Sequence, residues 1–141
     1  MAMKLGATRG VDVTKEKICD VMKELDMKEG FDVGLEMSGS PAAMADLVNN
    51  MANGGNIAIL GIFADDIKLD WDKVIFRSLT MRGIYGREMF DTWYKMSALL
   101  KTGLAERLEG IVTHNFHYTD FKKGFDTILA GEAIKVVLDW E

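Results

Sequence analysis

The sequence predicts an α/β fold whose strands form a doubly wound, mostly parallel sheet. Short apolar runs alternate along the 141 residues with amphipathic stretches that carry apolar residues every three or four positions. Glycines and polar residues separate these runs, and no linker rich in Pro, Gly and Ser interrupts them. Repeated strand–helix units of this kind place parallel strands between covering helices.

The first stretch resembles the end of one helix followed by a strand and a second helix. Ala2–Leu5 are good helix formers, and Gly6 suits a left-handed position after a helix. Residues 10–13 (GVDV) alternate like a short strand. Residues 14–27 are expected to form an amphipathic helix, with Cys19 as a small buried hydrophobe near its apolar face, which consists of Ile18, Val21, Met22 and Leu25.

The next stretch predicts a strand, a helix and a second strand. Residues 31–39 form a short, mostly buried strand. Ser40 suits the N-cap and Pro41 the first position of a helix that Gly54 and Gly55 end. Its buried residues are expected to be Met44, Leu47, Val48 and Met51. Residues 56–63 form a nearly continuous apolar run, which is typical of a strand covered on both faces.

An edge strand, a short helix and another strand follow. Residues 66–71 (DIKLDW) alternate Ile67, Leu69 and Trp71 with charged residues, as an edge strand does. A short turn or helix lies around residues 72–76, and residues 79–86 return to strand. These elements complete the expected parallel sheet.

The last third of the chain predicts a helix, a strand, a helix and a final strand. Residues 88–103 form an amphipathic helix with Gly103 just past its end. Residues 111–118 form a strand, and Thr119 caps a helix over residues 120–131. Residues 133–140 form the last strand.

Composition excludes several classes of function. The net charge of −5 provides no basic surface for nucleic acid. No apolar run reaches the roughly 20 residues that span a membrane, and no secretory signal opens the chain, so a cytoplasmic protein is expected. The single cysteine excludes an intramolecular disulfide.

His114 and His117 could share a metal ion, but half-exposed positions on a strand are the better interpretation.

Small residues follow two of the expected strands. Residues 37–40 (MSGS) and 60–62 (LGI) would let a flat ligand approach the backbone at the carboxyl ends of the strands. The alternative is that Gly39 and Gly61 only make tight turns. The chain has no G-x-G-x-x-G turn and no G-x-x-x-x-G-K-[ST] loop, so no motif for holding phosphates is present.

Five segments of the chain resemble one enzyme family. GFDVGLEMSGSPAA, GGNIAILGI, LDWDKVIFRSL, RGIYGREMFDTWYKM and DFKKGFD are similar to the corresponding segments of the zinc-dependent L-threonine 3-dehydrogenases, in the medium-chain dehydrogenase/reductase superfamily. The resemblance covers essentially the whole chain and matches the C-terminal part of a longer family protein. It implies a partial Rossmann-like sheet that lacks its first βαβ unit, with residues 1–84 in the NAD-binding domain. Residues 85–141 would be a C-terminal helix and strand segment of the catalytic domain.

The resemblance also implies roles for particular residues. Met37 and Ser38 match positions beneath the ribose on the nicotinamide side of NAD. Three residues match positions whose backbone meets the nicotinamide carboxamide: Leu60, Gly83 and Tyr85. For Met37, Leu60 and Tyr85, packing in the core is the alternative interpretation and the preferred one.

Two further roles concern residues of the predicted C-terminal segment, 85–141. Lys135 lies near the position from which a basic residue approaches the pyrophosphate. Arg87 lies beside the substrate pocket and could pair with the threonine carboxylate. The family's zinc ligands fall outside the chain, so no catalytic residue and no metal ligand is assigned within it.

The resemblance implies an enzyme that oxidises the 3-hydroxyl of L-threonine to give 2-amino-3-oxobutanoate, with zinc as Lewis acid and NAD as hydride acceptor. The chain alone is expected to be inactive, to bind NAD weakly and to bind no zinc stoichiometrically. The alternatives are a non-catalytic oligomerisation or interaction module and a weak nucleotide binder. A homo-oligomer is expected, in which the strand from Asp66 to Trp71 pairs with its copy.

Overall fold

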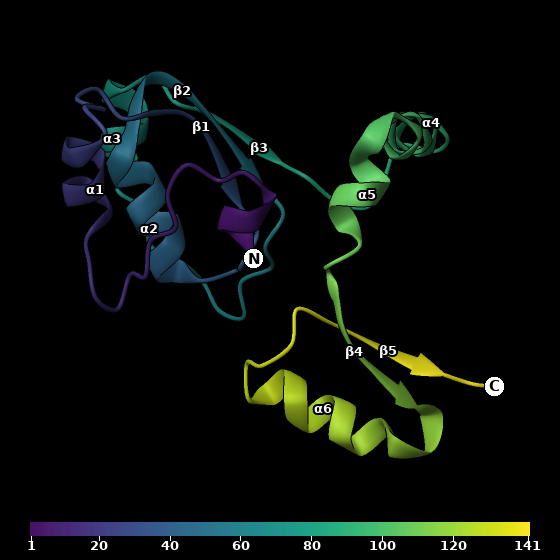
Figure 1. The fold of residues 1–141 in the computed structure, drawn as a ribbon. Helices are drawn as coiled ribbons and strands as arrows, with labels where there is room; N and C mark the ends of the chain where they lie inside the picture. Colours follow the sequence, from purple (N-terminus) through teal and green to yellow (C-terminus); the bar gives the residue numbers. More distant parts are fainter. The chain divides into compact units, whose positions relative to one another are not determined.

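The computed structural model describes residues 1–141 and divides them into two compact units. One unit consists of Arg9–Gly86, and the other of Met1–Thr8 together with Arg87–Glu141. Figure 1 shows the elements of both. The assignment of residues 1–84 and 85–141 to two domains of a family enzyme stays a prediction.

The Arg9–Gly86 unit contains a three-stranded parallel sheet in the order β1-β2-β3. Its elements follow the chain as α1 (Ile18–Glu24), β1 (Phe31–Glu36), α2 (Pro41–Asn50), β2 (Met51–Ile59), α3 (Trp71–Phe76) and β3 (Thr80–Gly83). Helix α2 begins as expected, because the Ser40 side chain accepts a hydrogen bond from the Ala43 amide and Pro41 occupies the first position. The α/β class and the parallel sheet are confirmed.

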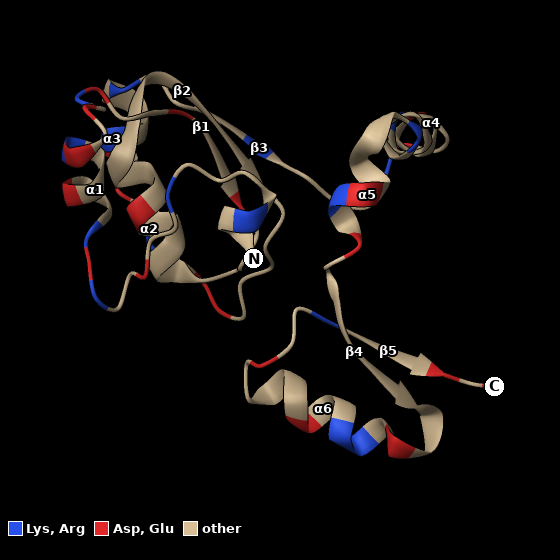
Figure 2. Cartoon of the chain, viewed as in Figure 1, with Lys and Arg blue, Asp and Glu red and all other residues tan.

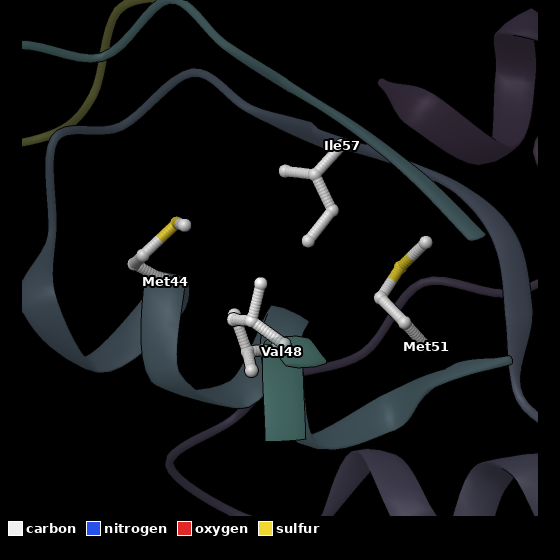
Figure 3. Packing of buried hydrophobic residues seen from close by; sticks show 5 residues of the cluster. Met44, Val48, Met51 and Ile57 are labelled. Carbon is white, nitrogen blue, oxygen red and sulfur yellow. The ribbon is translucent and has the colours of Figure 1, made fainter. Parts of the chain in front are cut away.

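A compact apolar cluster lies between α2 and the sheet. Met44 and Val48 come from α2, and Met51 and Ile57 come from β2. Figure 3 shows these four side chains converging on one another. Val74 of α3 completes the cluster, and Leu47 packs against it half-buried. The expected burial of Met44, Val48 and Met51 is confirmed, although Met51 belongs to β2 and not to the helix.

Gly54 and Gly55 do not end α2, because the helix already ends at Asn50 and both glycines lie inside β2. The register there is irregular: Phe31 pairs with Met51, but Val33 pairs with Asn56. The additional residues of β2 form a bulge in which the glycines lie.

The strand predicted over residues 56–63 ends earlier, at Ile59. Leu60 and Ile62 are exposed. Val33 and Leu35 of β1 are exposed as well, so the expectation of a mostly buried strand over residues 31–39 is wrong. The apolar cluster covers one face of this sheet only.

Residues 10–13 do not form the expected strand. Asp12 instead organises a turn, in which its carboxylate accepts hydrogen bonds from the Thr14 amide and hydroxyl. Its carbonyl accepts from the amides of Lys15 and Glu16. Helix α1 begins only after this turn, at Ile18. Cys19 is exposed on this helix, whose buried residues are Val21 and Met22, so the prediction of a buried cysteine is wrong.

Residues 66–71 do not form an edge strand, since the segment has no strand pairing and Trp71 already begins α3. Ile67 and Leu69 do share one side, as the alternation indicated. They pack half-buried against the unit's own apolar cluster. Only Trp71 of the three apolar residues is exposed.

Arg77 directly follows α3, and its side chain caps the carboxyl end of α2. Its Nη1 atom donates to the carbonyls of Asn49 at 2.9 Å and Met51 at 2.8 Å, and more weakly to that of Val48 at 3.4 Å. The last carbonyls of a helix have no partner within the helix, so a cation here satisfies several of them at once.

Replacing Arg77 by methionine is therefore expected to lower the free energy of unfolding of this unit by about 2 kcal/mol, because hydrogen bonds from a charged donor are lost. Urea denaturation of the full chain measures the change. Arg82→Met is the matched control, since the Arg82 side chain is exposed on β3 and makes no hydrogen bond or ion pair. Equal losses in the two variants would contradict this role of Arg77.

The second unit contains a two-stranded parallel sheet of β4 (Val112–His117) and β5 (Lys135–Asp139). Helix α6 (Phe121–Leu129) connects the strands and lies alongside them (Figure 1). The remaining elements are η1 (Ala2–Leu5), α4 (Asp91–Leu99), η2 (Leu100–Leu104), α5 (Ala105–Leu108) and η3 (Tyr118–Asp120). Gly6 is left-handed after η1, as expected.

Thr119 does not cap α6, because residues 118–120 form the short helix η3 before it. Asp120 takes the N-cap position of α6. The Thr119 hydroxyl lies 2.7 Å from Nδ1 of His117, the N-cap residue of η3, so this threonine takes part in the cap of η3 instead.

Charges of both signs are interspersed along the helices and loops of each unit (Figure 2). None of the helices has the length and apolar character that crossing a membrane requires.

Candidate functional site

The candidate site lies at the carboxyl end of the β1-β2-β3 sheet. Because the strands are parallel and in register, Glu36, Ile59 and Gly83 lie side by side where β1, β2 and β3 end. Five of the predicted binding residues belong to these ends or to the loops directly after them: Met37, Ser38, Leu60, Gly83 and Tyr85. In open parallel sheets, ligands bind at this end.

A buried carboxylate organises this end of the sheet. Glu36 is only 3% exposed and has no ion pair with a lysine or arginine. Its Oε1 atom accepts from the Ser38 hydroxyl at 2.6 Å and from the Ser38 amide at 3.0 Å. The Gly39 amide lies 3.1 Å from both carboxylate oxygens. The hydrogen bond from the Ser38 hydroxyl lowers the pKa of Glu36 below its ordinary value, against the effect of burial.

The backbone of Glu36 joins the loop after β1 to the loop after β2. Its carbonyl accepts from the Leu60 amide at 2.8 Å and from the Gly61 amide at 3.1 Å. A Cβ atom on Gly61 would lie 2.1 Å from Oε2 of Glu36, and a Cβ atom on Gly39 would lie 2.3 Å from the Ile62 carbonyl oxygen. Both glycines are therefore required by contact between the two turns, which supports the tight-turn interpretation.

Three predicted residues are exposed at this end and not packed in the core. Met37 is 63% exposed, Leu60 45% and Tyr85 92%, so the preferred expectation of core packing is wrong for all three. A Cβ atom on Gly83 would meet no atom within 4 Å, which leaves the backbone there open. An open cavity of about 360 Å³ adjoins the loop after β1 and is lined by Leu35, Glu36, Met37, Ser38, Ala43 and Leu47.

Arg87 and Lys135 belong to the second unit. The Arg87 guanidinium lies 5.1 Å from the centre of the Trp93 ring, in a cation–π contact. It makes no ion pair with a carboxylate of the chain. Lys135 is the exposed first residue of β5, and its carbonyl accepts from the Thr113 hydroxyl at 3.3 Å.

The residues of this chain do not fit a metal site. No group of three or more His, Cys, Asp or Glu side chains could hold a metal ion. His114 stacks on Phe116 with ring centres 6.0 Å apart, and His117 contacts Thr119. Because side chains alternate along a strand, residues three positions apart on β4 face opposite sides.

Sequence reasoning missed Glu36, although a signal was present. The strand FDVGLE contains one glutamate at its end, followed two residues later by a serine and then a glycine. A carboxylate in that position can accept from the amides two and three residues later and from the serine hydroxyl, as it does here. The pattern E-x-S-G at a strand end is thus the signal.

Residues 1–102 match the family model described as zinc-binding dehydrogenase. Across its whole length the chain is 58% identical to an L-threonine 3-dehydrogenase of Alteromonas mediterranea and 55% identical to one of Idiomarina loihiensis. It spans 41% of the length of each of these relatives.

Solved structures share the fold at lower sequence identity. The chain matches 2R,3R-butanediol dehydrogenase from Bacillus subtilis with a TM-score of 0.81 and 19% identity, over 99% of this chain and 40% of that one. It matches the alcohol dehydrogenase TADH from Thermus sp. ATN1 with a TM-score of 0.82 and 22% identity, over the same shares.

Proposed function

Because this chain belongs to the zinc-binding dehydrogenase family, we propose that it forms the nicotinamide side of the NAD site in an enzyme that oxidises the 3-hydroxyl of L-threonine. The names of relatives that are 58% and 55% identical over the whole chain support this substrate. The product would be 2-amino-3-oxobutanoate. NAD supplies a hydride acceptor when it is bound.

The observation that carries the proposal is the set of backbone groups left free at the carboxyl ends of the strands. The Leu60 amide donates to Glu36, which leaves the Leu60 carbonyl as the group available to a ligand. The Tyr85 amide donates to no group of the protein. A carboxamide has one oxygen and two N–H groups, so it can accept from Tyr85 while it donates to Leu60.

The side chains around these groups suit a flat, partly apolar ring. Met37 and Leu60 are exposed beside the loops, and Gly83 leaves the backbone of β3 open. Apolar walls with a few oriented polar groups are typical of cofactor sites. These residues would orient the ring and exclude water from one side of it.

Arg87 is proposed to bind the carboxylate of L-threonine. Its guanidinium is held against Trp93 and has no protein carboxylate as partner. A guanidinium in that state can donate two parallel hydrogen bonds to a carboxylate. Lys135 is proposed to approach the pyrophosphate from the start of β5. No step is assigned to zinc, since the side chains of this chain do not fit a zinc site.

Calorimetric titration of the full chain tests the proposal. Nicotinamide mononucleotide and NAD are expected to bind with similar dissociation constants, each weaker than about 100 μM, or about −5.5 kcal/mol. The reason is that the chain has no glycine-rich turn to hold the phosphates at a helix N-terminus. Adenosine monophosphate should not compete. A dissociation constant for NAD tighter than about 100 μM, or equal binding of the adenine half, would contradict this assignment.

The expected homo-oligomer stays a prediction. The contact proposed for it assumed a strand at Asp66–Trp71, which the structure lacks. A second candidate function, assembly with another copy, is favoured by Val33 and Leu35, which are exposed on the edge strand β1. Light scattering at micromolar concentration distinguishes a monomer from an assembly.

A further inference from the structure

We propose that Glu36 is a positioning residue that holds the Met37–Ser40 turn and the Leu60–Ile62 turn together as one rigid platform for the nicotinamide ring. The proposal rests on the proposed function, because the ligand is the nicotinamide half of NAD. Glu36 would not touch the ring. It would act through the backbone of Leu60 and the side chains of Met37 and Leu60.

The first argument is that a carboxylate suits this position better than other side chains. Four contacts converge on its two oxygens, from the Ser38 hydroxyl and from the amides of Ser38 and Gly39. All of these groups are donors, and an ionised carboxylate only accepts. A glutamine would turn one oxygen into an N–H₂ group, which would face donors.

The second argument is that the same residue also holds the neighbouring turn. The Glu36 carbonyl accepts from the amides of Leu60 and Gly61, and Oε2 lies where a side chain on Gly61 would begin. The two turns also touch directly, since a Cβ atom on Gly61 would lie 2.2 Å from the Gly39 nitrogen. Loss of the carboxylate contacts would leave the carbonyl bonds in place but free Gly39, and through this close packing it would loosen both turns, although Leu60 lies 24 positions away in the sequence. The orientation of the free Leu60 carbonyl depends on this junction.

The third argument is that Glu36 stays buried without a cation. Burial of a charge without compensation costs free energy, and only the four contacts with Ser38 and Gly39 offset it. A residue needed only to fill space at the end of β1 would not require a charge. The buried charge is explained if the turn must keep one geometry.

Glu36→Gln tests the proposal in the full chain, with Asp32→Asn as the matched control, since Asp32 lies on the same strand and is exposed. Amide hydrogen exchange without ligand is measured first. In Glu36→Gln, the amides of Ser38, Gly39, Leu60 and Gly61 are expected to lose about tenfold in protection, while the Ile57 amide in the core changes by less than about threefold. Asp32→Asn should leave all five unchanged.

The second measurement is the dissociation constant of nicotinamide mononucleotide. Glu36→Gln is expected to weaken binding about fivefold to tenfold, and Ser38→Ala, which removes one of the donors, by less. Unchanged affinity in Glu36→Gln despite loosened turns would overturn the positioning role. A uniform loss of protection that includes Ile57, or no loss at the four amides, would overturn it as well.

The two measurements separate this proposal from the proposed function. If the unaltered chain binds no nicotinamide mononucleotide, the proposed function fails and the ligand role of Glu36 fails with it. If the ligand binds and the variant binds equally well, only the role of Glu36 fails. The exchange experiment identifies the loosened amides in either case.

Discussion

Gly39→Ala is expected to lower the free energy of unfolding of the Arg9–Gly86 unit by about 3–4 kcal/mol. Two costs add together. The backbone of Gly39 has a φ of +69°, where a side chain is strained by about 1–2 kcal/mol. The new Cβ atom would also lie 2.3 Å from the Ile62 carbonyl oxygen, which is a backbone atom, so one of the two turns must move.

Gly54→Ala is the matched control for this prediction. Gly54 has a nearly identical φ of +75°, but a Cβ atom there would meet nothing within 4 Å. The control therefore carries only the backbone cost, about 1–2 kcal/mol. Native-state hydrogen exchange at core amides of β2 measures both variants in the full chain. If Gly39→Ala costs no more than Gly54→Ala, the two turns are not in the close contact described.

Met44→Ala is expected to destabilise the same unit by a similar amount, about 3–4 kcal/mol. Met44 has no exposed surface, and it packs among Val48, Met51 and Ile57 in the apolar cluster (Figure 3). Truncation removes buried apolar atoms and leaves a cavity that the neighbouring helix and sheet cannot close. Urea denaturation of the full chain measures the loss.

Two variants control for this prediction. Met37→Ala makes the same substitution at an exposed position and should change stability by less than about 0.5 kcal/mol. Met44→Leu keeps the volume and should cost less than about 1.5 kcal/mol. A small loss for Met44→Ala, equal to that of Met37→Ala, would show that the cluster is not the core of the unit.

Much of the fold follows from signals within a few residues. Ser40 and Pro41 mark the start of α2, and the apolar spacing after them predicts the buried face. The parallel sheet follows from the alternation of strands and helices. Five sequence segments also indicated the family, and the 58% identical relative carries the indicated name.

Two of the wrong predictions share one cause, which is that local patterns do not show what covers a side chain. The apolar run at residues 56–63 resembles a doubly covered strand, yet Leu60 and Ile62 are exposed. Residues 66–71 alternate as an edge strand does, yet Ile67 and Leu69 pack on the unit's own core. An edge strand and an irregular segment packed on the core can both show this alternation of apolar and charged residues.

The sequence by itself determined the α/β class, the family and the clustering of candidate residues at strand ends, because periodicity, capping residues and motifs act over short distances. Only the tertiary structure decided that Glu36 holds two turns together and that Arg77 closes α2 from 26 to 29 residues away. The Arg77 side chain donates to carbonyls far away in the sequence, whereas Glu36 reaches the Leu60 and Gly61 amides through its backbone carbonyl. Both roles arise from the folded backbone, which brings polar groups distant in the sequence within hydrogen-bond distance.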